Sequence, residues 1–293
     1  MLTFLGGLGL TSLSSRLVAP RCSNDRERFF KESNLSQEER VNLYSILQEA
    51  DLEGVRQIAL RHARSFGTFL DRRPIAEYNS EAFMTAQGFL KHHGGRDIII
   101  DAGCGTGMST EIIAEANPDQ LVLGIDRSAV RIARKKDGIV QNAQFIRANL
   151  VDVWRLALEH RWVVKKQYVL YPNPYPKKTD LKKRWHGHAC FPLLLQIGGE
   201  LELRSSWLGY VQEFAHALQT LAQDEEVMES LGLGGRRIEI SEVETMQLNN
   251  NYLSNFERKY ACSGMPLYRL LVHLGDGSIK YCSTNNDEIS TNP

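Results

Sequence analysis

An acid followed by three glycines stands near the middle of the chain and could seat a nucleotide cofactor. The stretch 98–107 reads IIIDAGCGTG, in which Asp101 precedes glycines at alternate positions, Gly103, Gly105 and Gly107. Glycine lets a backbone turn tightly and approach a ligand closely, and a helix that begins after such a loop attracts polar ligand groups. The spacing disfavours a dinucleotide fold, because the third glycine of G-x-G-x-x-G would fall at Met108. The alternative is a plain strand-to-helix turn, with Cys104 as a small filler rather than a nucleophile.

Two polar side chains after the next strands could complete such a site. Asp126 follows the apolar run 120–125 and lies 19 residues beyond Gly107 (126 minus 107). A carboxylate there has two acceptor oxygens for the two hydroxyls of a ribose, and its alternative role is an N-cap of the following helix. Asn149 follows a strand expected at 143–146, and its amide can bond the edge of an adenine. Asp152 is the acid nearest to it.

The stretch 171–178, YPNPYPKK, follows a fourth expected strand. Prolines on both sides of Asn173 prevent a sheet ladder from continuing, so we expect a rigid loop at the carboxyl edge, where open α/β sheets bind ligands. A basic run follows, comprising Lys177, Lys178, Lys182, Lys183 and Arg184. These side chains could contact nucleic-acid phosphates, and a solvated loop is the alternative.

Other reactive side chains carry weaker signals. His186 and His188 are separated by a glycine and lack a third ligand, so we interpret them as structural. The five cysteines are widely spread and form no C-x-x-C pair, which argues against a zinc site and against a disulfide framework. We therefore expect no metal and a reducing compartment.

Alternating strands and helices must position these groups. Apolar runs at 98–100, 120–125, 143–146 and 167–170 alternate with helical patterns, which is typical of a parallel sheet. Helical patterns also precede the first strand, from Ser36 to about Phe66 behind a capping box with Glu39, and at 80–92. We expect an α/β fold with a doubly wound, mostly parallel sheet. Its expected segments are a flexible or targeting segment 1–35, a helical extension 36–95, a core domain 96–275 and a polar tail 276–293.

Composition limits the partners and the compartment. Lys plus Arg and Asp plus Glu both number 35 in 293 residues, so any nucleic-acid surface has to be a local patch. No apolar run approaches the roughly 20 residues of a membrane span, and we expect no membrane partner. Residues 1–24 include Arg16 and Arg21 but no acid, which suits an organellar transit peptide, although an untidy bacterial N-terminus or the start-codon choice could give the same pattern. We expect an intracellular protein, in a mitochondrion or plastid if this segment is a transit peptide and otherwise in the cytoplasm. Nothing in the sequence specifies an oligomeric state.

The glycine stretch resembles motif I of the class I S-adenosylmethionine (SAM)-dependent methyltransferases, and later segments resemble the TrmB-type tRNA (guanine-N7) methyltransferases. In that family a P-D-P-W-x-K loop and a basic run follow the fourth strand, and PNPYPK matches the loop with two changes. The family's T-D-W-x-x-Y segment corresponds to Ser206, Trp207 and Tyr210, and its T-x-F-E segment to 254–257. The resemblance covers about 61–274 in the same order.

This resemblance implies a seven-stranded, Rossmann-like sheet, SAM as methyl donor and tRNA as partner. It implies cofactor-binding roles for Asp101, Gly103, Cys104, Gly105, Gly107, Asp126 and Asn149. It gives Asn173 the catalytic position and assigns substrate binding to Lys177, Ser206, Tyr210, Ser254, Phe256 and Glu257. The RNA phosphate contacts would be Lys178, Lys182, Lys183 and Arg184.

Two departures from the family concern the methyl acceptor. Asn173 and Ser206 replace acids that are thought to hold the Watson–Crick edge of guanine. Methylation at N7 makes the base cationic, so the lost carboxylates remove roughly a few kcal/mol of compensation in a dry site. The N7 lone pair is free, so transfer requires positioning rather than a base. Two alternatives stay open: a methyltransferase for another amine of a nucleobase or protein, because Asn173 between prolines resembles the N-P-P-Y loop of amino-group methyltransferases, and a SAM- and RNA-binding module without turnover.

Overall fold

The structure, a computed structural model, describes residues 49–275 apart from 96, 135–139 and 249. The expected segment 1–35, the capping box of Ser36 and Glu39 and the tail 276–293 lie outside the described residues. Within the described residues, every helix is too short or too polar to span a membrane.

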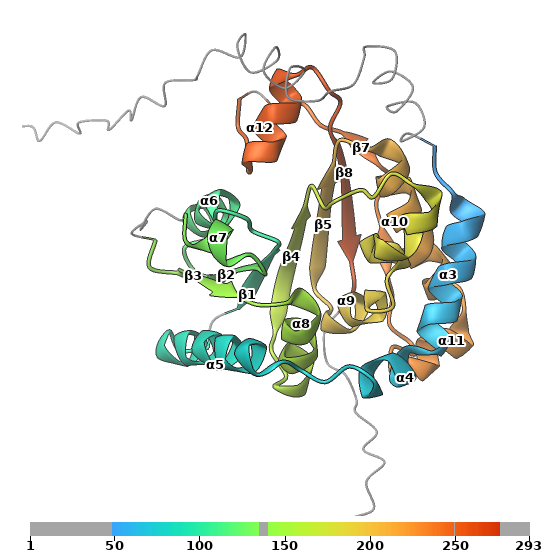
Figure 1. Ribbon diagram of the computed structural model, residues 1–293, viewed down its shortest axis with the longest axis horizontal. Helices are drawn as coiled ribbons and strands as arrows, with labels where there is room; N and C mark the ends of the chain where they lie inside the picture. Colours follow the sequence, from blue (N-terminus) through green and yellow to red (C-terminus); the bar gives the residue numbers. More distant parts are fainter. Residues whose placement is uncertain (1–48, 96, 135–139, 249, 276–293) are drawn as a thin grey trace, which may run out of the picture.

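A mixed β-sheet runs through the centre of the protein (Figure 1). Its strands are β1 (Ile98–Ala102), β2 (Leu121–Asp126), β3 (Ala143–Arg147), β4 (Val164–Leu170), β5 (Glu200–Ser205), β6 (Glu239–Ile240), β7 (Glu244–Thr245) and β8 (Tyr268–His273). Their order across the sheet is β3-β2-β1-β4-β5-β8-β6, and β7 pairs with β8 beside this path. Strands β3, β2, β1, β4 and β5 pair in parallel, whereas β8 is antiparallel to β5, β6 and β7. The expected mostly parallel sheet is confirmed, with β7 as an addition to the seven strands expected.

The direction of strand succession reverses between β1 and β4. Strands β2 and β3 extend the sheet on one side of this pair, and β5 extends it on the other. Open α/β sheets bind ligands in the crevice at such a switch point, outside the carboxyl ends of the strands. The loop after β1, residues 103–107 (the glycine loop), and the loop after β4, residues 171–177 (the proline loop), both leave this edge.

Helices surround the sheet (Figure 1). They are α3 (Leu52–Arg64), α4 (Phe66–Asp71), α5 (Glu77–His92), α6 (Met108–Ala116), α7 (Ala129–Ile132), α8 (Leu150–Glu159), α9 (Phe191–Ile197), α10 (Leu208–Ala222), α11 (Glu225–Ser230) and α12 (Asn255–Cys262), with 3-10 turns η1 (Lys178–Lys183) and η2 (Trp185–Gly187). Helix α3 packs on α10, α5 on α8 and α8 on α9. Helix α12 lies beyond the ends of β4 and β5 (Figure 1).

Within the described residues, the helical extension is divided into α3, α4 and α5. Residues 49–51 are not helical, and α3 begins only at Leu52, with the Asp51 carboxylate accepting a hydrogen bond from the Gly54 N–H. The chain breaks again at Ser65, between α3 and α4. The part of the expected helical pattern that precedes residue 49 lies outside the described residues, and from Leu52 onward the pattern forms α3 and α4.

Both faces of β1 are buried, as its run of isoleucines predicts. Ile98 and Ile100 point into the large core, whereas Ile99 packs with Ile113 of α6 in a smaller cluster. Alternate residues of a strand face opposite sides, so covering both faces requires helices on each side of the sheet. This double cover holds the end of β1, and therefore the glycine loop, in place.

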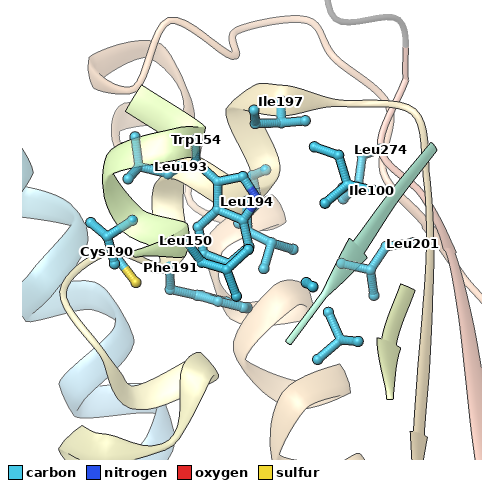
Figure 2. Close-up of a cluster of buried hydrophobic side chains, with 14 of the residues drawn as sticks. Ile100, Leu150, Trp154, Cys190, Phe191, Leu193, Leu194, Ile197, Leu201 and Leu274 are labelled. Carbon is cyan, nitrogen blue, oxygen red and sulfur yellow. The ribbon is translucent and has the colours of Figure 1, made fainter. Parts of the chain in front are cut away.

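Figure 2 shows the large core where α8 and α9 meet the sheet. The Trp154 ring of α8 lies among Leu193 and Leu194 of α9 and is fully buried. Truncation of such a residue to alanine typically destabilises a protein by about 3–5 kcal/mol. This core fixes the spacing between the elements that precede and follow the proline loop.

The described cysteines differ from one another. Cys104 and Cys190 are free and buried. Cys262, at the end of α12, is disulfide-bonded. The spacing of the cysteines did not predict a disulfide at Cys262.

Candidate active site

The glycine loop has the geometry of a cradle for a ligand. Gly103, Gly105 and Gly107 have φ angles of 85°, 61° and 91°, a region that L side chains rarely adopt. A Cβ added at Gly103 or Gly105 would meet nothing within 4 Å, whereas at Gly107 it would lie 2.4 Å from the Phe145 ring. The first two glycines therefore leave open space, and the third allows close packing of the loop on β3.

Asp101 is the buried acid at the end of β1. One carboxylate oxygen accepts hydrogen bonds from the Ser109 hydroxyl (2.6 Å) and the Thr110 hydroxyl (2.7 Å) at the start of α6. Burial raises the pKa of Asp101 to about 6, against the lowering effect of the two hydroxyls, and the charge of Asp126 adds to the rise. The carboxyl thus changes charge close to neutral pH, and a cationic ligand group would favour its ionised form.

Asp126 ties the end of β2 to the glycine loop. Its carboxylate accepts hydrogen bonds from the backbone N–H groups of Gly105 (3.1 Å) and Ser128 (2.8 Å). Arg131 also donates to it at 2.9 Å, from a side chain that is half exposed. The N-cap of α7 is Ser128, so Asp126 does not take the alternative role of N-cap. An acid hydrogen-bonded to the glycine loop, with a half-exposed arginine beside it, fits the predicted ribose-binding role.

Asn149 has a structural role that the sequence analysis did not predict. Its side-chain oxygen caps α8 by accepting from the Val151 N–H (3.0 Å). The nearby Asp152 is buried and bonds Asn79 and Arg73, which joins α8 to the helical extension. Asp152 is therefore a packing residue, and the Asn149 side chain keeps its nitrogen and one oxygen lone pair for an adenine.

The proline loop holds strained residues on both sides of Asn173. Tyr171 and Tyr175 have φ angles of 50° and 43°, and a non-glycine residue in this region costs about 1–3 kcal/mol. Asn173 is exposed, and its side-chain oxygen accepts from the Tyr175 N–H at 3.2 Å. This Asx turn fixes the amide at the tip of the loop.

Glu257 of α12 lies beneath the proline loop and not at its surface. It is fully buried, and its carboxylate accepts from the Tyr171 hydroxyl (3.0 Å) and from Arg204 of β5 (2.9 Å). It also accepts from the Leu253 N–H, and Ser254 caps α12 by accepting from the Glu257 N–H. The assignment of Glu257 to substrate contact is therefore corrected: it anchors the proline loop to β5 and α12.

Arg184 is also internal. Its guanidinium is paired with Glu213 of α10 and donates to the Tyr175 carbonyl, and its side chain is only 11% exposed. The prediction that Arg184 contacts RNA phosphate is wrong, because its donors are used inside the protein. Tyr210 is buried as well, where its hydroxyl accepts from the Trp185 N–H, and Ser206 is buried after β5. A substrate could reach neither Tyr210 nor Ser206 without rearrangement.

The remaining predicted residues lie at the surface. Lys177, Lys178, Lys182 and Lys183 are exposed along the loop and η1. Lys183 pairs with Asp180 at 2.9 Å, so its charge is partly compensated. Phe256 of α12 is 54% exposed and stacks on Tyr260, which in turn lies against Tyr171. Among the described residues, no group of three or more His, Cys, Asp or Glu is arranged to hold a metal ion.

Residues 95–268 match the Methyltransf_4 family, described as "Putative methyltransferase". The match spans more than half of the chain. The chain belongs to this methyltransferase family. The family predicted from the glycine and proline loops is thereby confirmed.

Individual relatives are distant. A tRNA (guanine-N(7)-)-methyltransferase of Bacillus subtilis (strain 168) is 24% identical over 185 residues, which cover 60% of this chain and 79% of that protein. A protein of the same name from Acidithiobacillus ferrooxidans is 23% identical over 225 residues, covering 74% and 92%. A solved 16S rRNA (adenine(1408)-N(1))-methyltransferase from Catenulisporales acidiphilia is 17% identical, covers 66% of this chain and 92% of that chain, and has a TM-score of 0.43.

Several residues of this methyltransferase site escaped the sequence analysis. Ser109 and Thr110 could have been found, because hydroxyls in the first turn of α6 face back towards the end of β1. Tyr171 and Arg204 gave no signal, since only the folded chain brings them to Glu257. The structure thus adds a supporting layer beneath the two loops.

Proposed function

We propose that the chain transfers a methyl group from SAM to N7 of a guanine in tRNA. The observation that carries this proposal is the placement of the glycine loop and the proline loop at one edge of the sheet, after the neighbouring strands β1 and β4. The names of the Bacillus and Acidithiobacillus relatives support guanine N7 and tRNA as acceptor.

The residues present fit SAM. The open positions at Gly103 and Gly105 leave room for its close approach, Asp126 offers acceptors for ribose, and Asp101 offers an acid for the methionine end. When bound, SAM supplies an electrophilic methyl group on a sulfonium. The buried position of Asp101 strengthens any charge interaction made there, because the local dielectric is low.

The chain's own task is positioning and exclusion of water. Guanine N7 has a free lone pair, so no residue has to remove a proton before transfer. Asn173 at the tip of the proline loop would accept a hydrogen bond from the N1–H or the exocyclic amine of the base. Exposed Lys177, Lys178 and Lys182 would hold phosphates, and Phe256 offers an exposed ring on which a base can stack.

A second candidate is transfer to another amine of a nucleobase or protein. The neutral amide of Asn173 between two prolines favours it, because an amide oxygen can accept from an exocyclic amine.

The compartment stays a prediction from residues 1–24: mitochondrion or plastid if they form a transit peptide, otherwise cytoplasm.

A transfer assay with tritium-labelled SAM separates these candidates. Purified protein is incubated with bulk tRNA or with bulk protein, and the label is traced by nucleoside and amino-acid chromatography. The proposal expects label in 7-methylguanosine with the wild type and its loss with Asn173→Ala. Label in another nucleoside or in protein would establish the second candidate, and tRNA binding without label in either variant would show a module without turnover.

A further inference from the structure

Both backbone polar groups of Tyr175 in the proline loop are hydrogen-bonded to side chains. Its N–H donates to the Asn173 side chain at 3.2 Å, and its carbonyl accepts from Nε (3.2 Å) and Nη2 (3.1 Å) of Arg184. Tyr175 also has a φ of 43°. Because L residues rarely adopt this conformation unaided, surrounding contacts must maintain it.

Arg184 is in turn fixed by a buried carboxylate. Its Nη1 pairs with Glu213 of α10, whose side chain is only 1% exposed. Glu213 also accepts from His186 Nε2 (2.9 Å) and from the Asp51 N–H (2.9 Å). The Glu213 carboxylate of α10 therefore contacts η2 through His186 and the residue before α3 through the Asp51 N–H. It also binds the Arg184 guanidinium that donates to the proline loop.

The charge states suit this arrangement. Burial lowers the pKa of His186, against the raising effect of the Glu213 carboxylate. Burial alone would raise the pKa of Glu213, but hydrogen bonds from His186 and Arg184 bring it below the ordinary value. The Glu213 carboxylate thus faces the Arg184 guanidinium and also accepts from His186 and the Asp51 N–H.

We propose that Arg184 and Glu213 are positioning residues for methyl transfer, which hold the backbone of Tyr175 and thereby orient the Asn173 side chain. This inference rests on the proposed function, in which Asn173 meets the acceptor base. It assigns no substrate contact to Arg184 or Glu213. Loss of the hydrogen bonds between Arg184 and the Tyr175 carbonyl should slow the chemical step, while cofactor binding at the glycine loop is retained.

The test variant is Arg184→Lys, because a lysine cannot reproduce a guanidinium fork that reaches two partners. Its matched control is Arg236→Lys, since Arg236 also donates to main-chain carbonyls, those of Leu195 and Gln196 before β5. Glu213→Gln is a second variant that keeps the shape of the side chain and removes the charge. Full-length proteins are compared.

The first readout is amide hydrogen exchange of peptides covering 171–178, which needs no substrate. Exchange should accelerate at least about tenfold in Arg184→Lys and in Glu213→Gln but not in Arg236→Lys. The second readout is steady-state transfer to tRNA, in which kcat should fall roughly tenfold to a hundredfold with KM for SAM changed less than about twofold.

Unchanged loop exchange in both variants would overturn the positioning role, and so would accelerated loop exchange with an unchanged kcat. If wild-type protein transfers no methyl to tRNA, the proposed function fails, while the exchange measurement still decides whether Arg184 and Glu213 hold the loop.

Discussion

Replacing either of two glycines in the glycine loop by alanine should impair a different property of the protein. Gly105 and Gly107 both have positive φ angles, but only Gly107 lies against another residue, the Phe145 ring. Gly105→Ala should therefore impair SAM binding, and Gly107→Ala should impair folding.

The magnitudes follow from the local geometry. An alanine at Gly105 costs about 1 kcal/mol for its left-handed conformation and keeps the N–H that bonds Asp126. Its Cβ occupies the open side of the loop, so we expect SAM affinity to fall at least tenfold, or about 1.4 kcal/mol. At Gly107 the same strain is joined by a contact of 2.4 Å with Phe145, and overpacking adds about 1–3 kcal/mol.

The assay combines calorimetric titration of SAM with urea unfolding of both variants. Gly88→Ala is the control, because a Cβ there meets nothing within 4 Å inside α5; it should bind SAM normally and gain about 0.5–1 kcal/mol of stability. Wild-type SAM affinity in Gly105→Ala would refute the assignment of the glycine loop as cofactor cradle.

Three further predictions concern the supporting residues. Glu257→Ala leaves the buried Arg204 charge with one carboxylate fewer and should lower the free energy of unfolding by about 3 kcal/mol in urea titrations; a loss below about 1 kcal/mol would contradict the anchoring role. SAM affinity should weaken as pH falls through about 6, by up to tenfold per pH unit, because protonation removes the charge of Asp101, and Asp101→Asn should abolish this dependence in titrations at pH 5–8. In the free protein the sign is opposite: between pH 3.8 and about 6 the folded state binds more protons through Asp101, so its contribution to stability declines as pH rises. Lys178→Ala and Lys182→Ala should each reduce the slope of log affinity for tRNA against log salt by about 0.7–0.9, whereas an unchanged slope would exclude a phosphate contact.

The cofactor half of the protein could be predicted from the sequence because it is local. The isoleucines of β1, the glycines after it and Asp126 lie within thirty residues, roughly the size of one strand–helix–strand unit. Their period and spacing therefore specify the structure directly. The strand β4 was harder to delimit, because Lys165 and Lys166 hide its beginning in the hydrophobicity pattern.

The acceptor half could not be predicted because its contacts are remote in sequence. Arg184 and Glu213 are 29 residues apart, and Tyr171 and Glu257 are 86 apart. The sequence of a basic run does not show which of its side chains is buried, so it does not distinguish Arg184 from the exposed lysines. Glu257 likewise matches a motif position, but only packing shows that its carboxylate meets Arg204.

The proposed transfer to guanine N7 is tested most directly by chemical mapping of 7-methylguanosine in tRNA treated with the protein and unlabelled SAM. Borohydride reduction followed by aniline cleaves RNA at this nucleoside, and sequencing gels locate the scission. Methyl transfer to guanine N7 predicts scission at a guanine with wild-type protein and none with Asn173→Ala. Methyl incorporation into the tRNA without any scission at guanine would contradict it.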